Sequence, residues 1–169
     1  MSDDKGENQE GGCSCGAVRY RLLDVPLFVH CCHCTWCQRE SGSAFAVNVM
    51  IEASKVALLK GRLRKDKLPS PSGAGQLFSR CSDCGVTLWS NYGAAGEAIH
   101  FVRGGTLDDP AAAAPTIHIF TDSKLPWVVL PPDVPSVAEF YRRSAYWPAA
   151  HVERYKAALA GHKQFPDGL

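Results

Sequence analysis

The chain has 169 residues, of which 46% are hydrophobic and 21% are charged, a balance typical of a globular protein rather than a disordered one. Eighteen Lys and Arg residues against seventeen Asp and Glu residues leave a net charge of +1, which disfavours a general binder of nucleic acid or anionic membranes. No apolar run approaches the roughly 18 residues that a membrane-spanning helix needs. Residues 1–10 are polar and lack the basic and apolar stretches of a secretory signal, so we expect a cytoplasmic protein.

Short segments with alternating apolar and polar residues predict a mainly β domain built from antiparallel hairpins. In segment 44–51, for example, Phe45, Val47 and Val49 fall on one face of an extended chain. The expected strands lie at 17–23, 44–51, 56–60, 86–90, 98–103, 116–121 and 127–130. Segment 69–76, rich in Pro, Ser and Gly, is expected to be a mobile loop that borders the functional site.

Helices are expected only near the end of the chain. The spacing of Ser136 and Glu139 matches a capping box and predicts a helix up to about Tyr146. Pro148 interrupts this helix and can begin a second one, which should end near Gly161. These elements predict a disordered tail over 1–10, a zinc-binding β domain over 11–131, and a helical extension over 132–169 packed on the same domain.

Eight cysteines carry most of the chemistry that the sequence offers. They occur in tight clusters, with the patterns C-x-C at 13–15, C-C-x-C-x-x-C at 31–37 and C-x-x-C at 81–84. Disulfide bonds are the alternative, but they require an oxidising compartment, and closely spaced thiolates can converge on one metal ion. We therefore predict two zinc ions per chain.

The first and last clusters predict a closed structural zinc site. In each of them a glycine follows the second cysteine and supplies a backbone position at which a positive φ is allowed. A closed site needs four ligands, which we expect to be Cys13, Cys15, Cys81 and Cys84. Because these segments lie far apart in the sequence, the metal should stabilise the fold directly.

The middle cluster predicts a second, labile zinc with a catalytic role. Cys32 and Cys34 share a face in an extended segment, and Cys37 can return to them after a turn. Three thiolates leave zinc one open coordination position, as in catalytic sites. Such a metal can hold a substrate thiol as thiolate or polarise an aldehyde oxygen, and we expect thiolate activation or simple positioning because three thiolates weaken its Lewis acidity.

Three neighbouring residues leave alternatives open at this second site. Cys31 has the opposite parity and is expected to be a small buried residue. His33 is expected on the surface or behind the ligands, with a proton shuttle as the alternative. The site also becomes a closed structural one if Cys31, His30 or His33 supplies a fourth ligand.

These cysteine patterns resemble the glutathione-dependent formaldehyde-activating enzyme family, whose fold is called Mss4-like. The resemblance runs from about Gly11 to Leu130, and its matching stretches are 12–20, 32–39 with 41–43, 81–85, 105–110, and 118–120 with 126–127. It implies an antiparallel β domain with zinc-linked hairpins, a structural zinc at the first and last clusters, and a catalytic-type zinc at Cys32, Cys34 and Cys37. It also implies a carbon–sulfur lyase that joins glutathione and formaldehyde into S-hydroxymethylglutathione.

The partners implied are a small thiol and an aldehyde, with no nucleic acid and no membrane. Candidate anchors for the carboxylates of glutathione are Arg39, Arg80, Arg103 and Lys124, although such residues are usually solvated surface charges. A non-catalytic zinc module that binds a protein partner is the alternative function. A zinc deaminase is disfavoured, because the H-x-E motif at 151–153 follows the C-x-x-C motif, whereas in deaminases it comes first.

Overall fold

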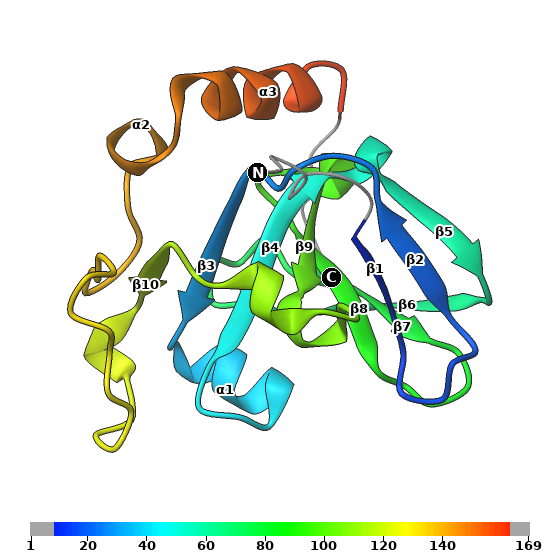
Figure 1. The fold of residues 1–169 in the computed structure, drawn as a ribbon, viewed down its shortest axis with the longest axis horizontal. Helices are drawn as coiled ribbons and strands as arrows, with labels where there is room; N and C mark the ends of the chain where they lie inside the picture. The colour runs from blue at the N-terminus through cyan, green and yellow to red at the C-terminus, as the bar shows by residue number, and fades with distance from the viewer. Residues whose placement is uncertain (1–8, 163–169) are drawn as a thin grey trace, which may run out of the picture.

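The computed structural model describes residues 9–162, and within this range the chain is mostly β, as the sequence predicts (Figure 1). A three-stranded sheet has the order β1-β2-β5, and a seven-stranded sheet has the order β10-β3-β4-β9-β8-β7-β6. Neighbouring strands are antiparallel, except that β10 runs parallel to β3. The strands are β1 Glu10–Gly12, β2 Arg19–Leu22, β3 Phe28–Cys32, β4 Ala46–Glu52, β5 Val56–Lys60, β6 Leu63–Leu68, β7 Gln76–Cys81, β8 Thr87–Tyr92, β9 Ile99–Arg103 and β10 Ile117–Ile119.

The seven-stranded sheet forms the middle layer of the molecule, because its strands bury side chains on both faces. In β4, Met50 packs into one hydrophobic cluster and Val49 into another, as expected for residues of opposite parity. The first cluster, the extension-side core, also contains Trp147 and Tyr155 from the last part of the chain. The second cluster, the small-sheet core, contains Tyr20 of β2, so the three-stranded sheet covers that face.

Three α-helices occur in the described residues: α1 Thr35–Ser41, α2 Arg143–Tyr146 and α3 Ala149–Leu159. The prediction of a helix that begins after Pro148 is confirmed by α3. The longer helix predicted from Ser136 is wrong, because only its last turn, α2, is helical. The backbone there runs beside β10 instead: His118 N–H donates to the Pro135 carbonyl and Val137 N–H donates to the His118 carbonyl. The Phe120 and Thr121 N–H groups likewise donate to the carbonyls of Glu139 and Val137, which a helix would need as acceptors for its own backbone bonds.

Six of the seven expected strands are present, and the strand expected at 127–130 is not. That segment is irregular and lies between prolines, and the Val129 side chain is 88% exposed. The sequence patterns did not reveal β1, β3, β6 and β7. Strand β6 is an edge strand with charged residues at consecutive positions, and β3 contains polar His30 where alternation would place an apolar residue.

The ends of the chain extend past the described residues, so the predicted tail falls mostly outside them; its last residue, Glu10, belongs to β1. In the extension, His151 Nδ1 lies 2.7 Å from the Leu27 carbonyl oxygen. Arg154 forms an ion pair with buried Glu52, with an N–O distance of 2.8 Å. No helix within residues 9–162 is long and apolar enough to cross a membrane.

Candidate functional site

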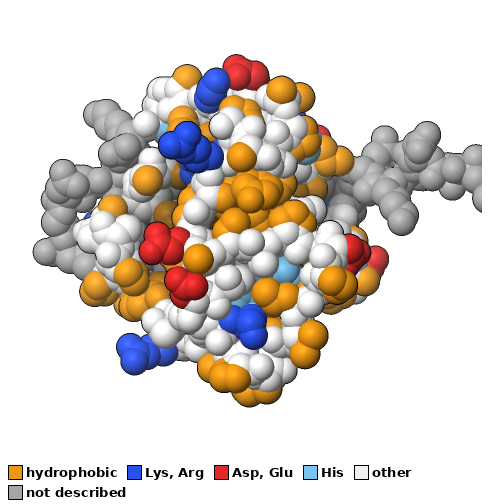
Figure 2. Space-filling view, turned by 90° about the vertical axis from the view of Figure 1, so that its left-hand side faces the viewer, with side chains coloured by type: hydrophobic (Ala, Val, Ile, Leu, Met, Phe, Trp, Pro, Cys, Tyr) orange, Lys and Arg blue, Asp and Glu red, His pale blue; other side chains and the backbone are white. Residues whose placement is uncertain are grey.

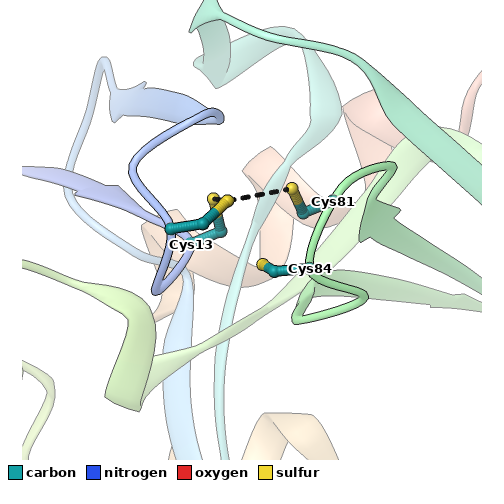
Figure 3. A group of neighbouring side chains, drawn as sticks. Cys13, Cys81 and Cys84 are labelled. Atoms are coloured by element: carbon teal, nitrogen blue, oxygen red, sulfur yellow. Dashed lines mark hydrogen bonds between the residues drawn. The ribbon is translucent and has the colours of Figure 1, made fainter.

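Four cysteines come together where the two sheets meet. Cys13 follows β1, Cys15 lies in the next turn, Cys81 ends β7, and Cys84 lies in the turn before β8. Their sulfur atoms all lie within 4.8 Å of one another, and Figure 3 shows Cys13, Cys81 and Cys84 pointing toward a common centre. Cys13 and Cys81 are buried in the small-sheet core, whereas Cys15 and Cys84 are exposed. We refer to these residues as the four-cysteine group.

Tight turns bring each pair of cysteines in this group to the centre. Gly16 and Gly85, which follow the second cysteine of each pair, have φ values of 73° and 76°. A Cβ atom at either position would meet no atom within 4 Å, so the backbone conformation, and not a lack of space, favours glycine. Burial raises the pKa of the Cys13 thiol, but the Val18 N–H and the neighbouring thiols outweigh it and bring the pKa to about 6.

The second group contains Cys32, Cys34 and Cys37, whose sulfur atoms also lie within 4.8 Å of one another. We refer to them as the three-cysteine group. Cys32 ends β3, Cys34 caps the N-terminus of α1, and Cys37 lies in its first turn. The Cys37 N–H donates to Cys34 Sγ over 3.3 Å, which fixes the turn that the C-x-x-C spacing suggested. Hydrogen bonds from Cys32 and Cys37 hold the pKa of the Cys34 thiol well below its usual range.

Both groups fit zinc by their donor atoms and spacing. Zinc–sulfur bonds of about 2.3 Å in a tetrahedral arrangement place sulfur atoms roughly 3.8 Å apart. In the four-cysteine group, Cys15 Sγ lies 3.4 Å from Cys13 Sγ and 3.8 Å from Cys81 Sγ. Thiolates prefer zinc and other soft metal ions over magnesium or calcium. All eight cysteines are free thiols, so the disulfide alternative is not supported.

A third group lies on the opposite face of β3 from Cys32. Cys31, His33 and His118 are all buried and have donor atoms within 4.8 Å of one another. His33 Nε2 lies 2.9 Å from His118 Nδ1, so the two rings form a hydrogen-bonded pair. The surface position considered for His33 is therefore wrong. Within the described residues, neither Cys31 nor a histidine joins the three-cysteine group as a fourth member.

An apolar cavity of about 270 Å³ lies beside the three-cysteine group. Cys32 and Cys34 line it together with five aromatic residues. Its rim includes Ser70 and Ser72, so the loop expected at 69–76 does border this site. In the sequence, Trp36 lies between Cys34 and Cys37. Its indole N–H donates to buried Gln76 over 2.7 Å. This bond joins α1 to the start of β7 and fixes the indole in the cavity wall.

Two polar side chains lie in the cavity wall on the same sheet face as Cys32. His30 precedes Cys32 by two residues in β3, and Asn48 lies opposite His30 in the neighbouring strand β4. His30 is 3% exposed, and its Nδ1 atom has no hydrogen-bond partner within residues 9–162. Burial, followed by the charges of Arg103 and Arg143, lowers the His30 pKa to about 3. His30 is therefore a neutral hydrogen-bonding group beside the cysteines at pH 7.

None of the four candidate anchors for glutathione lines this cavity. Arg80 forms ion pairs with Glu40 and Asp66, and Lys124 Nζ donates to the carbonyl oxygens of Leu125 and Val128. Arg39 is exposed on α1. Of the four, Arg103 lies closest to this cavity, because it pairs with Asn48 of the cavity wall and donates to Asn48 Oδ1 over 2.6 Å. Arg103 itself lines a different cavity.

Sequence patterns alone did not reveal the cavity, nor the roles of His30, Trp36 and His118 in and behind it. His118 belongs to segment 118–120, one of the stretches that resemble the family. Only the parallel pairing of β10 with β3 places it beside Cys31. His30 was considered only as a metal ligand, and the structure places it in the cavity wall instead.

The family of the chain follows from its sequence. The family model described as glutathione-dependent formaldehyde-activating enzyme matches residues 8–123, well over half of the chain. The chain belongs to this family. The match includes every residue of the four-cysteine and three-cysteine groups.

Two individual proteins are similar to this family member. A Halomonas elongata protein is 27% identical over 127 residues, which cover 70% of this chain and 78% of that protein, and its name provisionally assigns it to the same enzymes. A crystal structure of a Rhodobacter sphaeroides protein is 18% identical, with a TM-score of 0.46, and covers 76% of this chain and 99% of that chain.

Proposed function

We propose that the protein joins a thiol to an aldehyde and is a carbon–sulfur lyase, with glutathione and formaldehyde, which the family description names, as the reference pair. The observation that carries the proposal is the position of the apolar cavity. Cys32 and Cys34 of the three-cysteine group line it, whereas no member of the four-cysteine group does. A thiolate-rich group beside a cavity suits chemistry on a bound molecule, and the other group suits a structural role.

In this proposal each chain holds two zinc ions with different roles. The four-cysteine group would hold a closed structural zinc that links the turn after β1 to the turn after β7. Cys32, Cys34 and Cys37 would hold a second, labile zinc. When bound there, zinc supplies an open position that stabilises a thiolate near neutral pH.

The residues of the chain would position the reactants and exclude water. The thiol S–H bond breaks, a C–S bond forms, and the proton ends on the former carbonyl oxygen as a hydroxyl group. His30 and Asn48 offer polar atoms beside Cys32 for the aldehyde oxygen or its hydroxyl product. The aromatic walls exclude bulk water, which strengthens these hydrogen bonds. The uncatalysed addition is already easy, so positioning is the main contribution.

The two proposed zinc sites also favour a reducing compartment such as the cytoplasm, because cysteines that bind zinc must stay reduced. All eight cysteines are unpaired, including exposed Cys15 and Cys84. In an oxidising compartment, exposed thiols this close together would form disulfides. A reducing environment keeps them available as metal ligands.

The test is the exchange rate between free glutathione with formaldehyde and the S-hydroxymethyl adduct, followed by NMR with zinc-loaded protein. We expect an exchange rate clearly above that in buffer, and a rate equal to buffer for Cys34→Ala. Cys31→Ser is the matched control, because Cys31 is buried in the same strand but lies outside the three-cysteine group. If intact zinc-loaded protein gives only the buffer rate, the proposed reaction is wrong.

A non-catalytic zinc module that binds a protein partner is the second candidate, and one observation favours it. Trp127 is 71% exposed and Val129 is 88% exposed, in the irregular segment after β10. Large apolar side chains at the surface are common in interaction sites. Stoichiometric protein binding that is lost in Trp127→Ala and does not depend on a thiol would support this candidate over the enzyme.

A further inference from the structure

The cavity beside the three-cysteine group is much larger than formaldehyde requires. Its volume is about 270 Å³, whereas a single water molecule needs only about 10–15 Å³ of such space. Formaldehyde has only one carbon atom more than water. The cavity approaches the lower end of the range for drug-sized ligands, about 300 Å³. A one-carbon aldehyde would leave most of it to water.

The walls of the cavity are apolar and aromatic. Five aromatic side chains line it: Trp36, Tyr92, Phe101, Phe120 and Phe140. Tyr92 and Phe101 meet edge to face, with ring centroids 4.7 Å apart, so that part of the wall is packed and rigid. Such walls gain free energy by covering an apolar ligand and gain little from a small polar one. Figure 2, which views the molecule from the β10 side, shows hydrophobic side chains gathered at the centre of this face.

Besides its two cysteines, this cavity has no side chain in its lining that is ordinarily charged at pH 7. The lining contains no Asp, Glu, Lys or Arg, and the His30 side chain in its wall is buried. A carboxylate placed there would lose its hydration beside the cysteines without gaining an Arg or Lys partner, which is costly. The charged ends of glutathione therefore belong outside this cavity. An uncharged group is what the cavity can hold.

From the size of the cavity, its aromatic walls and its lack of Asp, Glu, Lys and Arg, we infer that it selects an uncharged apolar group of about aromatic-ring size carried by the aldehyde. The inference rests on the proposed thiol–aldehyde chemistry and names its substrate class. The aldehyde carbon would lie near Cys32 and Cys34, its oxygen near His30 and Asn48, and its apolar group against the aromatic walls. The thiol would approach from the rim, where its charged ends remain in water.

The first experiment measures binding without chemistry. Ligand-observed NMR on the zinc-loaded full-length protein compares 2-phenylethanol, phenylacetate and ethanol, none of which reacts with thiols. We expect 2-phenylethanol to bind at least about tenfold more tightly than phenylacetate, and ethanol to show no measurable binding. Equal affinity for 2-phenylethanol and phenylacetate, or no binding of 2-phenylethanol, would overturn the inference.

Two variants place this binding in the cavity. Phe140 is 46% exposed and lines the cavity, so Phe140→Asp introduces a charge into the wall with little risk to folding. It should weaken 2-phenylethanol binding about tenfold, whereas Trp127→Asp, at an exposed aromatic residue outside the lining, should not. Ser72→Arg adds a cation at the rim and should tighten phenylacetate binding. Equal effects of Phe140→Asp and Trp127→Asp would contradict the inference.

The second experiment separates the inference from the proposed reaction. The acceleration of adduct exchange over buffer is measured with glutathione and either phenylacetaldehyde or formaldehyde. We expect an acceleration about tenfold greater for phenylacetaldehyde, an advantage that Phe140→Asp removes.

Acceleration of formaldehyde alone would overturn the inference and leave the proposed reaction standing. Binding of 2-phenylethanol with no acceleration of either aldehyde would support the apolar selectivity and overturn the reaction. Selective binding of an apolar thiol, such as benzyl mercaptan, in place of 2-phenylethanol would also overturn the inference.

Discussion

The four-cysteine group and the three-cysteine group differ most in how the chain builds them. The first joins two turns from distant parts of the sequence, since Cys15 and Cys81 are 66 residues apart. The second comes from one strand end and the helix that follows it. A metal bound by distant segments closes a long loop and stabilises the native state, whereas a metal bound by one local segment constrains little else.

The exposure of the cysteines does not follow this division of roles. Two members of the four-cysteine group are exposed, whereas Cys32 and Cys37 of the three-cysteine group are buried. The cavity makes the difference, because it leads to Cys32 and Cys34 from one side. Access to a substrate therefore depends on the space beside the ligands, and the exposure of the cysteines alone would have suggested the opposite assignment.

Loss of a ligand in the four-cysteine group should have the largest effect on stability. Cys81 is fully buried in the small-sheet core, and Cys81→Ser removes a proposed zinc ligand there. We expect the free energy of unfolding to fall by about 4 kcal/mol or more, or the protein to be insoluble. Urea unfolding of the purified protein measures this change.

The matched control for Cys81→Ser is Cys31→Ser, because Cys31 is just as buried but lies outside both proposed zinc sites. Burying a hydroxyl group there should cost only about 1–3 kcal/mol. If the two substitutions cost the same, the four-cysteine group does not hold a metal that stabilises the fold.

Loss of a ligand in the three-cysteine group should remove activity with little loss of stability. Cys34→Ala removes a ligand beside the cavity, and we expect no acceleration of adduct exchange and a loss of less than about 2 kcal/mol of unfolding free energy. Cys15→Ala, in the four-cysteine group, should show the reverse, with a larger loss of stability. Kinetics and urea unfolding of both variants check this crossed pattern, and a parallel loss of both properties in both variants contradicts it.

The sequence predicted the mainly β fold and the separate cysteine clusters because these depend on short-range signals, whereas the pairing of the first and last clusters was inferred from the four ligands that a closed zinc site needs. Alternation of apolar residues is visible within a strand, and glycines such as Gly16 and Gly85 mark the turns that hold the cysteines. The spacing of Cys34 and Cys37 predicted a turn, but the expectation of helices only near the end of the chain is wrong, because α1 begins here and its Cys37 N–H donates to Cys34 Sγ. Each of these features can be read from a few neighbouring residues.

The cavity and the His33–His118 pair could not be predicted, because they depend on contacts between distant segments. His118 reaches His33 only through the parallel pairing of β10 with β3. The wall of the cavity combines residues from β3, β4, α1 and the extension, and Phe140 belongs to a segment that the capping-box spacing wrongly predicted as helix. In that segment, hydrogen bonds to β10 outweigh the local helical signal.

Mild chelation should remove the two proposed zinc ions one after the other, and the site with fewer cysteine ligands should lose its zinc first. The three-cysteine group offers fewer ligands and a cavity through which a chelator can approach, so we expect about one zinc of two to leave first. Activity should disappear at that point, while the strand content measured by circular dichroism remains. Metal analysis and reaction with a thiol reagent follow the loss, and the thiols of the three-cysteine group should react before those of the four-cysteine group.

A simultaneous loss of both metals with the fold would contradict this division of roles. The same holds if Cys15 and Cys84, the exposed members of the four-cysteine group, react first. In that case exposure of the ligands, and not their number, governs the lability of the metal.

Acid should lower the free energy of unfolding through the buried histidines near the cavity. This is the smallest of the four expected effects. Burial lowers the pKa of His30 to about 3 and, together with the charge of His118, that of His33 to about 4, from about 6.5 in an unfolded chain. Below pH 6.5 the unfolded state therefore binds more protons than the native state, so stability is fully present above about pH 6.5 and falls as the pH drops toward 4.

His30→Gln removes one such group, and we expect the stability lost between about pH 7.5 and pH 5.5 to shrink by about 1 kcal/mol. His162→Gln, at an exposed histidine, is the matched control for the substitution itself. Urea unfolding at both pH values measures the difference, and comparison between the two variants cancels the acid-dependent loss of zinc that they share. If His30→Gln and His162→Gln show the same pH dependence, His30 is not held neutral in the folded protein.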